Sequence, residues 1–149
     1  MKIPVKILLS RGMELPTYAT DGSAAVDLRA AIDEGTTLTI APGERALVPT
    51  GIAIAPESRE VVAILAARSG LAIKKGIRLS NGIGVIDSDY RGEICVGLHN
   101  TSRVPFTVNR GDRIAQMMFM PVLAAKLIEA ASLDETARGA GGFGSTGVK

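Results

Sequence analysis

Residues 84–94 read GVIDSDYRGEI and carry the clearest local pattern of the chain. An apolar run ends at Asp87, a polar turn follows, and apolar residues then alternate from Ile94 to Leu98. This arrangement predicts a strand, a tight turn and a return strand, which together make a β-hairpin. A carboxylate at the rim of such a hairpin is held by a rigid backbone and still reaches water, as a general base requires. Ordinary turn chemistry explains the same residues equally well, because Asp, Ser and Gly are common in turns.

Short β-branched and aliphatic runs recur on both sides of this stretch, separated by turn signals such as Pro42-Gly43. Many short strands at this spacing predict an all-β fold, a jelly-roll-like β-barrel or sandwich. One short helix is predicted from Ser69 to Lys75, and residues 124–131 suit a helix or a strand equally. The strands predicted beyond the hairpin's first arm are residues 5–9, 25–30, 36–40, 46–49, 52–55, 61–66, 94–99, 106–108, 114–120 and 122–124.

The end of the chain differs in composition from the rest. We predict one β domain over residues 1–137 and a flexible arm over residues 138–149, which read RGAGGFGSTGVK. Ordering glycine costs the most backbone entropy, so a mobile terminus is the ordinary interpretation. The arm nevertheless carries Arg138, which suits phosphate, and Phe143, which suits a flat ring, and glycine-flanked N–H groups can surround an anion.

Composition narrows the classes of function. The 149 residues include 17 Lys and Arg against 15 Asp and Glu, a net charge of +2 that does not suggest a nucleic-acid partner. One Cys and one His exclude an internal disulfide and a His/Cys metal cluster within the chain, so a metal would be a hard cation such as Mg²⁺. The start is no signal peptide, and no segment approaches the ~20 apolar residues of a membrane span. We therefore expect a cytoplasmic protein without a membrane partner.

The stretch RSGLAIKKG, residues 68–76, combines groups suited to phosphate. Arg68 and Ser69 stand just before or at a helix start, where backbone N–H groups, a hydroxyl and a guanidinium would converge on one anion. A helix cap beside a solvated arginine is the alternative.

Two further stretches place polar residues among apolar ones. In RGDRIAQMMF, residues 110–119, Gln116 lies either on a solvent face or in a polar site. In AAVDLRA, residues 24–30, Asp27 either holds a metal or its water shell or pairs with an arginine. Each stretch is a weak signal by itself.

Taken in order, five motifs resemble those of the trimeric deoxyuridine triphosphatases (dUTPases): AAVDLRA, RSGLAIKKG, GVIDSDYRGEI, RGDRIAQMMF and RGAGGFGSTG. The resemblance covers nearly the whole chain, and Ala67 departs from it where the family usually has Pro. It implies a jelly roll that assembles as a homotrimer with shared active sites and hydrolyses dUTP to dUMP and pyrophosphate with Mg²⁺, which supplies dUMP and keeps uracil out of DNA. The rival interpretations are a dCTP deaminase, whose family lacks this Gly-Phe-Gly arm, a non-catalytic jelly-roll module that binds nucleotide or protein and signals, and an all-β interaction domain.

The resemblance also implies roles for individual residues. Asp87 would activate the water that attacks the α-phosphorus, and Asp27 would reach Mg²⁺ through water. Tyr90 would pack on the deoxyribose, and Phe143 would stack on the uracil when the arm closes. The remaining implied substrate contacts are Arg68, Ser69, Gly70 and Gln116 at the phosphates, Asn81, Val85, Ile86 and Cys95 at the uracil, and Arg138, Gly144, Ser145 and Thr146 on the arm.

Overall fold

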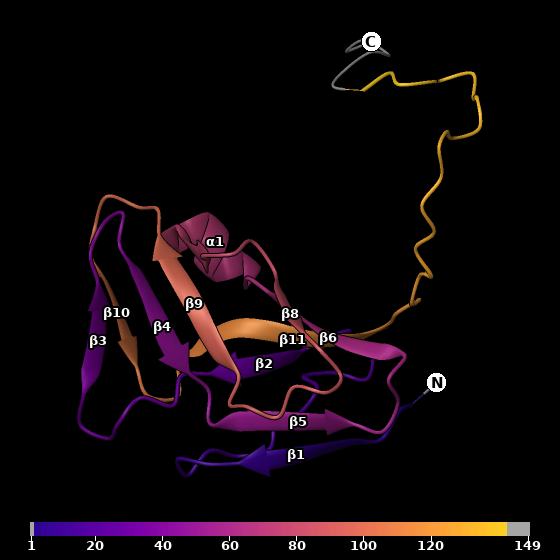
Figure 1. Ribbon diagram of the computed structural model, residues 1–149. Coiled ribbons are helices and arrows are strands. Elements are labelled where there is room, and N and C mark those ends of the chain that lie inside the picture. Colours follow the sequence, from indigo (N-terminus) through magenta and orange to yellow (C-terminus); the bar gives the residue numbers. More distant parts are fainter. Residues whose placement is uncertain (1, 143–149) are drawn as a thin grey trace.

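A computed structural model describes residues 2–142, which form a β-rich body with one short helix and an extended C-terminal segment (Figure 1). The helix of this described part is α1, Ser69–Lys75. The strands are β1 Val5–Leu9, β2 Val26–Arg29, β3 Thr37–Ile40, β4 Arg45–Pro49, β5 Ile52–Pro56, β6 Val61–Ala66, β7 Ile77–Leu79, β8 Gly84–Ile86, β9 Cys95–Asn100, β10 Phe106–Asn109 and β11 Arg113–Pro121.

The strands pair mostly with partners distant in sequence. Within residues 2–142 they form a four-stranded sheet in the order β2-β11-β6-β8, a three-stranded sheet in the order β4-β9-β7, and two pairs, β1-β5 and β3-β10. Every pairing is antiparallel. The architecture is all-β and jelly-roll-like, as the sequence predicts.

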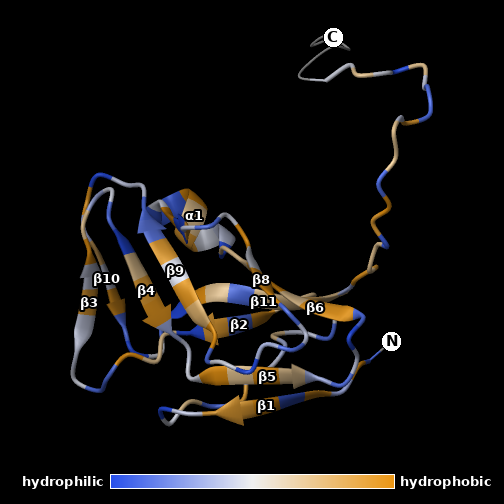
Figure 2. Ribbon diagram, in the orientation of Figure 1, coloured by the Kyte–Doolittle hydropathy of each residue, from blue (hydrophilic) through white to orange (hydrophobic). Residues whose placement is uncertain are grey.

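The core is almost entirely aliphatic. Leu28, Val48, Leu98 and Val108 are at most 1% exposed and belong to one continuous cluster. Hydrophobic residues gather on the strands of the body, while the connecting loops are more hydrophilic (Figure 2). In β9 the buried and half-buried positions alternate strictly, which confirms the alternation read from residues 94–98. One face of β9 therefore packs on the core, and the other is left for a surface site.

The predicted hairpin over residues 84–94 is wrong as a unit of pairing. Its first arm, β8, pairs with β6, where Ile86 lies opposite Ala63. Its second arm, β9, pairs with β4 and β7, so the two arms belong to different sheets. Alternation along the chain identifies strands, but it does not specify their partners. The segment between β8 and β9 is therefore a loop that bridges two sheets.

The helix α1 has the predicted bounds, Ser69–Lys75. Its end is set by Gly76, which has φ 67° in the left-handed region and donates its N–H to the carbonyl of Ala72 at 3.2 Å. Two lysines in the last turn interact favourably with the negative end of the helix dipole. The short strand β7, which follows directly, was not predicted.

The chain leaves the body after β11. The N–H of Val122 donates to the carbonyl of Glu60 at 2.8 Å, and nearly all residues from there to 142 are exposed and without helix or strand. The predicted strand over residues 122–124 and the helix or strand over 124–131 are therefore wrong, while a domain boundary at residue 138 stays a prediction. In the described part of the chain, no helix has the length and apolar character needed to cross a membrane.

Candidate active site

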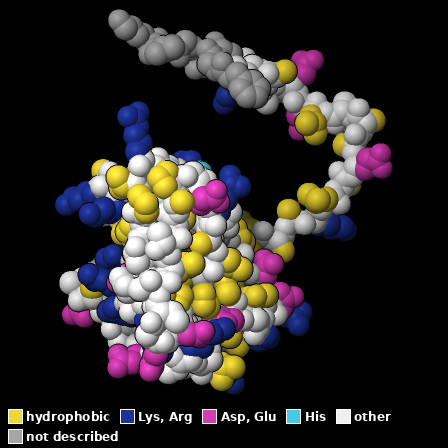
Figure 3. Space-filling view, turned by 90° about the vertical axis from the view of Figure 1, so that its left-hand side faces the viewer, with side chains coloured by type: hydrophobic (Ala, Val, Ile, Leu, Met, Phe, Trp, Pro, Cys, Tyr) yellow, Lys and Arg dark blue, Asp and Glu magenta, His cyan; other side chains and the backbone are white. Residues whose placement is uncertain are grey.

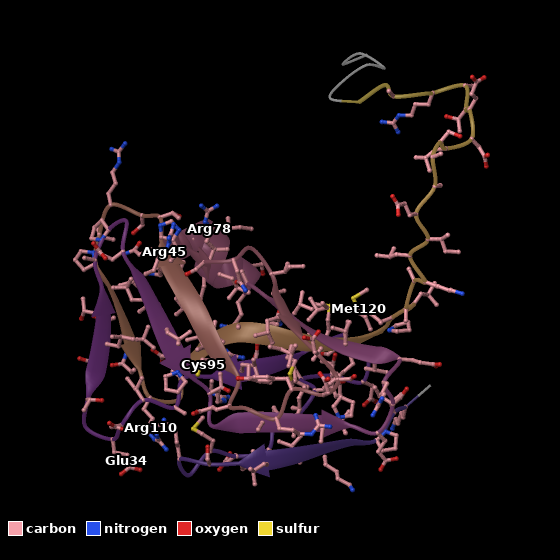
Figure 4. The ribbon with its side chains drawn as sticks, viewed as in Figure 1. Glu34, Arg45, Arg78, Cys95, Arg110 and Met120 are labelled. Atoms are coloured by element: carbon pink, nitrogen blue, oxygen red, sulfur yellow. The ribbon has the colours of Figure 1, made fainter. Side chains whose placement is uncertain are left out.

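The loop between β8 and β9 forms one wall of an open cavity of about 320 Å³. Five residues that the sequence assigned to a nucleotide site meet there, from the end of β8, the loop and the start of β9. Figure 4 labels one of them, Cys95, at the start of β9. The cavity is lined by Leu47, Val85, Ile86, Asp87, Tyr90, Glu93, Ile94 and Cys95. Its apolar walls and a single exposed aspartate at the rim suit a flat, uncharged ring joined to a reacting group.

Backbone and side-chain hydrogen bonds shape the loop. Tyr90 donates its N–H to the carbonyl of Asp87 at 3.1 Å and its hydroxyl to the carbonyl of Glu93 at 3.2 Å. The guanidinium of Arg91 donates to the carbonyls of Ser88, at 2.8 Å, and Tyr90, at 3.0 Å. The Asp87 carboxylate is exposed and makes no hydrogen bond to another residue of the described part. It is therefore free to accept a proton from a water molecule.

Cys95 is half-buried on the cavity wall. Burial raises the pKa of its thiol above the ordinary value, the nearby Glu93 carboxylate raises the pKa further, and the Arg11 guanidinium partly opposes both. The neutral thiol thus predominates at physiological pH and acts as an apolar wall.

We expect Cys95 to react slowly with Ellman's reagent near neutral pH. A raised pKa leaves a smaller thiolate fraction than in a free cysteine at the same pH, and the thiolate is the reactive form. The labelling rate should keep rising with pH beyond the ordinary cysteine pKa of about 8.5. The control is the same chain in concentrated guanidinium chloride, and equal rates for folded and unfolded protein would contradict the expectation.

A second polar cluster surrounds Asp27 on β2. Its Oδ1 accepts a hydrogen bond from Arg68 Nε at 3.0 Å, and its Oδ2 accepts one from Arg113 at 3.3 Å. Arg68 also donates to the Arg113 carbonyl at 3.2 Å and is only 25% exposed, so it is not a solvated arginine beside a helix cap. Gln116 lies directly opposite Asp27 in the β2–β11 register, and both line one surface pocket. Two guanidinium groups, an amide and a carboxylate thus gather on one face.

Comparison with known proteins identifies the family. A model of the dUTPase family matches residues 11–147. The chain belongs to the dUTPase family. It is 54% identical over 149 residues to a deoxyuridine 5′-triphosphate nucleotidohydrolase of Desulfitobacterium hafniense, a match that covers 98% of this chain and 97% of that one. A Rhizobium rhizogenes protein of the same name is 52% identical over 145 residues, covering 97% of this chain and 92% of that one.

Solved structures share the fold of this dUTPase family member. A variant of the Staphylococcus bacteriophage 80alpha dUTPase with dUpNHpp superposes with a TM-score of 0.86 at 22% identity, covering 97% of this chain and 99% of that one. A variant dUTPase from phage phi11 of S. aureus, described with a structural Mg(II) ion, gives a TM-score of 0.77 at 20% identity, covering 89% and 99%. The chain is accordingly an enzyme, a hydrolase with the jelly-roll-like dUTPase fold.

The structure does not bring all the expected dUTPase residues together. Asn81 is exposed in the turn between β7 and β8 and does not line the cavity with Asp87. Ser69 and Gly70 are exposed at the start of α1. Arg138 lies on the extended C-terminal segment, which stands away from the body (Figure 3). Phe143, Gly144, Ser145 and Thr146 lie outside the described residues.

The sequence assigned no site role to four residues of the two clusters, which are Leu47, Glu93, Ile94 and Arg113. Leu47 lies two positions after the exposed Arg45 in β4, so the alternation of side chains along a strand predicts that Leu47 is exposed as well. Glu93 and Arg113 stand within recognised motifs, but their contacts depend on loop geometry and strand pairing. No local pattern marks such residues.

The side chains around Asp27 suit a Mg²⁺ ion that keeps its water molecules better than an ion bound directly by several protein oxygens. The described residues contain no group of three or more His, Cys, Asp or Glu that would enclose an ion. Mg²⁺ usually keeps several waters and binds through one or two carboxylates together with substrate phosphates. Both oxygens of Asp27 already accept hydrogen bonds from guanidinium groups, so this carboxylate would reach such an ion only through its water shell.

Proposed function

We propose that the chain hydrolyses dUTP to dUMP and pyrophosphate with Asp87 as the general base. The observation that carries this proposal is the cavity beside the β8–β9 loop, which combines the exposed Asp87 carboxylate with Tyr90 and apolar walls. Relatives more than 50% identical over nearly the whole chain bear the name of this activity.

In the proposed reaction, Asp87 accepts a proton from a water molecule whose oxygen forms a bond to the α-phosphorus. The bond from that phosphorus to the α–β bridging oxygen breaks, and pyrophosphate leaves with the electron pair. Arg68 and Gln116 stabilise the negative charge on the phosphates, and Arg138, Ser145 and Thr146 of the arm add to them. Bound to the triphosphate, Mg²⁺ would neutralise charge, with Asp27 contacting its water shell.

Recognition of the nucleoside is assigned to the cavity walls. Val85, Ile86 and Cys95 surround the uracil, with Asn81 contributing from the neighbouring turn, and Tyr90 packs on the deoxyribose where a 2′-hydroxyl would collide. Groups that pair with uracil are left without partners against cytosine, which costs more than a missing contact. Phe143 stacks on the base when the arm closes, with Gly144 allowing the close approach.

We also propose a homotrimer with active sites shared between subunits. Two observations favour it. The Asp87 cavity and the pocket at Asp27 share no lining residue within one chain. In addition, Leu47 and Val85 at the cavity are 70% and 57% exposed, an arrangement typical of residues that a neighbouring subunit covers. Light scattering coupled to size exclusion should give the mass of three chains, and a monomeric mass would contradict the proposal.

Pyrophosphate release from dUTP, dCTP, dTTP and UTP tests the activity directly. We expect release from dUTP alone, dependent on Mg²⁺ and lost on chelation with EDTA. Deamination of dCTP would instead support the dCTP deaminase interpretation. Absence of turnover with every nucleotide would contradict the proposed function.

Substitution of Gly92 by Ala should impair use of dUTP. A Cβ at this position would lie 2.6 Å from Tyr90 Cζ, so the ring that packs on the deoxyribose must move. We expect kcat/KM for dUTP to fall roughly 10-fold, because a small displacement of a positioning group is enough for such losses. Gly22→Ala is the matched control, since an added Cβ there has nothing within 4 Å. Equal kinetics of the two variants in a steady-state assay would refute the role given to Tyr90.

A further inference from the structure

Glu93 lies near the end of the loop that carries Asp87 and Tyr90. Its carboxylate bonds this loop to two other segments of the chain. Oε1 accepts the N–H of Gly51 at 2.7 Å, in the turn between β4 and β5. The same oxygen accepts Arg11 Nε at 3.1 Å, in the segment that follows β1. Glu93 is only 28% exposed and its bond to Gly51 is partly shielded from water, whereas Arg11 is 43% exposed.

Arg11 adopts an unusual backbone conformation at this contact. It is the one non-glycine residue among residues 2–142 with a positive φ, 54°. Such conformations persist where the surroundings enforce them, and they concentrate at functional sites. Here Ser10 donates its N–H to the Gly51 carbonyl at 2.8 Å, and the Arg110 guanidinium donates to the Arg11 carbonyl. The segment that presents Arg11 to Glu93 is thus fixed independently of the ion pair.

A short chain of contacts leads from Glu93 to Asp87. The Glu93 carbonyl accepts the Tyr90 hydroxyl, and the Tyr90 N–H donates to the Asp87 carbonyl. On the other side, Thr50 Oγ1 donates to the Ile94 carbonyl at 2.6 Å, a fully buried contact. The end of the loop next to β9 is therefore bonded to the turn at Thr50 and Gly51. Tyr90 makes hydrogen bonds both to this end of the loop and to Asp87.

We propose that the Glu93 carboxylate positions the nucleoside cavity by holding the β8–β9 loop against the Gly51 N–H of the β4–β5 turn and against Arg11. Its loss releases Tyr90 and Asp87 from their places without unfolding the sheets. The inference rests on the proposed dUTP hydrolysis for its kinetic consequences. The structural consequence, a looser loop, is independent of any substrate.

The fold should survive loss of the Glu93 carboxylate. Ile94 donates its N–H to the Ile52 carbonyl at 2.7 Å, and Thr50 binds the Ile94 carbonyl, so the start of β9 keeps its own contacts with this turn. The β4–β9 ladder beyond it does not involve Glu93. The β8–β9 loop and strand β9 thus depend on different contacts. An experiment can therefore distinguish a looser loop from an unfolded strand.

The test compares Glu93→Ala, Glu93→Gln and Asp33→Asn with the unaltered chain. Gln keeps a neutral acceptor for the Gly51 N–H, whereas Ala keeps none. Asp33 is the other partner of Arg11, at 3.8 Å and 84% exposed, so Asp33→Asn controls for the charge near Arg11. We expect kcat/KM for dUTP to fall at least ~10-fold in Glu93→Ala, to be largely retained in Glu93→Gln and to be unchanged in Asp33→Asn.

Amide hydrogen exchange supplies a readout that needs no substrate. In Glu93→Ala the exchange rate at the Tyr90 N–H should rise, while that of Leu98 in the middle of β9 stays unchanged. Unaltered Tyr90 exchange together with unaltered kinetics would overturn the positioning role. Equal acceleration at Tyr90 and Leu98 with a lowered unfolding temperature would also overturn it, because Glu93 would then only stabilise the fold. Failure of the unaltered chain to hydrolyse dUTP would refute the proposed function instead, with the exchange result still deciding the positioning role.

Discussion

An Asp87→Asn variant is expected to lose ~10²- to 10⁴-fold of its dUTP turnover, the range that a positioned general base contributes. The amide has nearly the same shape as the carboxylate but cannot accept a proton from water at neutral pH. The loop should keep its conformation, because its contact with Tyr90 uses the Asp87 backbone carbonyl and not the side chain. The loss should therefore appear in kcat more than in KM.

Asp89→Asn is the matched control for this experiment. Asp89 lies in the same loop, is exposed, and has no hydrogen bond or ion pair with the described residues. Both variants would be assayed by pyrophosphate release, with thermal unfolding to verify the fold. An equal loss in the two variants would point to the charge of the loop as a whole, and full activity of Asp87→Asn would exclude Asp87 as the base.

The second large effect is expected from a chain that ends at residue 137. Removal of residues 138–149 takes away Arg138 and the glycine-rich segment assigned to the phosphates and the uracil. Loss of a single charge-stabilising donor in an active site commonly costs 10²- to 10³-fold, so we expect turnover to fall by ~100-fold or more. The unfolding temperature should hardly change, since the segment from residue 122 to 142 is almost entirely exposed.

A shorter deletion provides the control for the arm. Removal of residues 147–149 leaves Arg138 and residues 143–146 in place, and we expect it to retain activity. The two truncated chains should elute from size exclusion like the complete one. Full turnover of the chain that ends at residue 137 would show that the arm takes no part in the reaction.

Local patterns predicted the strands well, because alternation and turn residues are properties of neighbouring positions. β1 and β6 have the predicted bounds, and α1 was found from its closing glycine. The hairpin was wrong because β8 pairs with β6, about twenty positions earlier, and no neighbouring residue encodes that choice. The strand predicted for residues 122–124 failed for a related reason: its sequence is apolar, but in the described residues no strand lies beside it.

The residues of the candidate site were likewise predicted where local motifs mark them and missed where they depend on contacts between distant segments. Motif resemblance placed Asn81, Val85, Ile86, Asp87, Tyr90 and Cys95 around the nucleoside, and the structure brings all of them except Asn81 into one cavity. The contact between Glu93 and the Gly51 N–H was invisible in the sequence, since the two residues are 42 positions apart and meet through loop geometry.

The central position of β11 governs when the body is able to fold. β11 lies between β2 and β6 in its sheet, so a growing polypeptide cannot complete this sheet until residue 121 has been synthesised. Until then β2 and β6 have unpaired edges, which promote aggregation. Pairing across such sequence separations is slow, on the order of milliseconds to seconds. A ribosome product that stops inside β11 is thus expected to aggregate, whereas one that stops just after it should still become a soluble, inactive body.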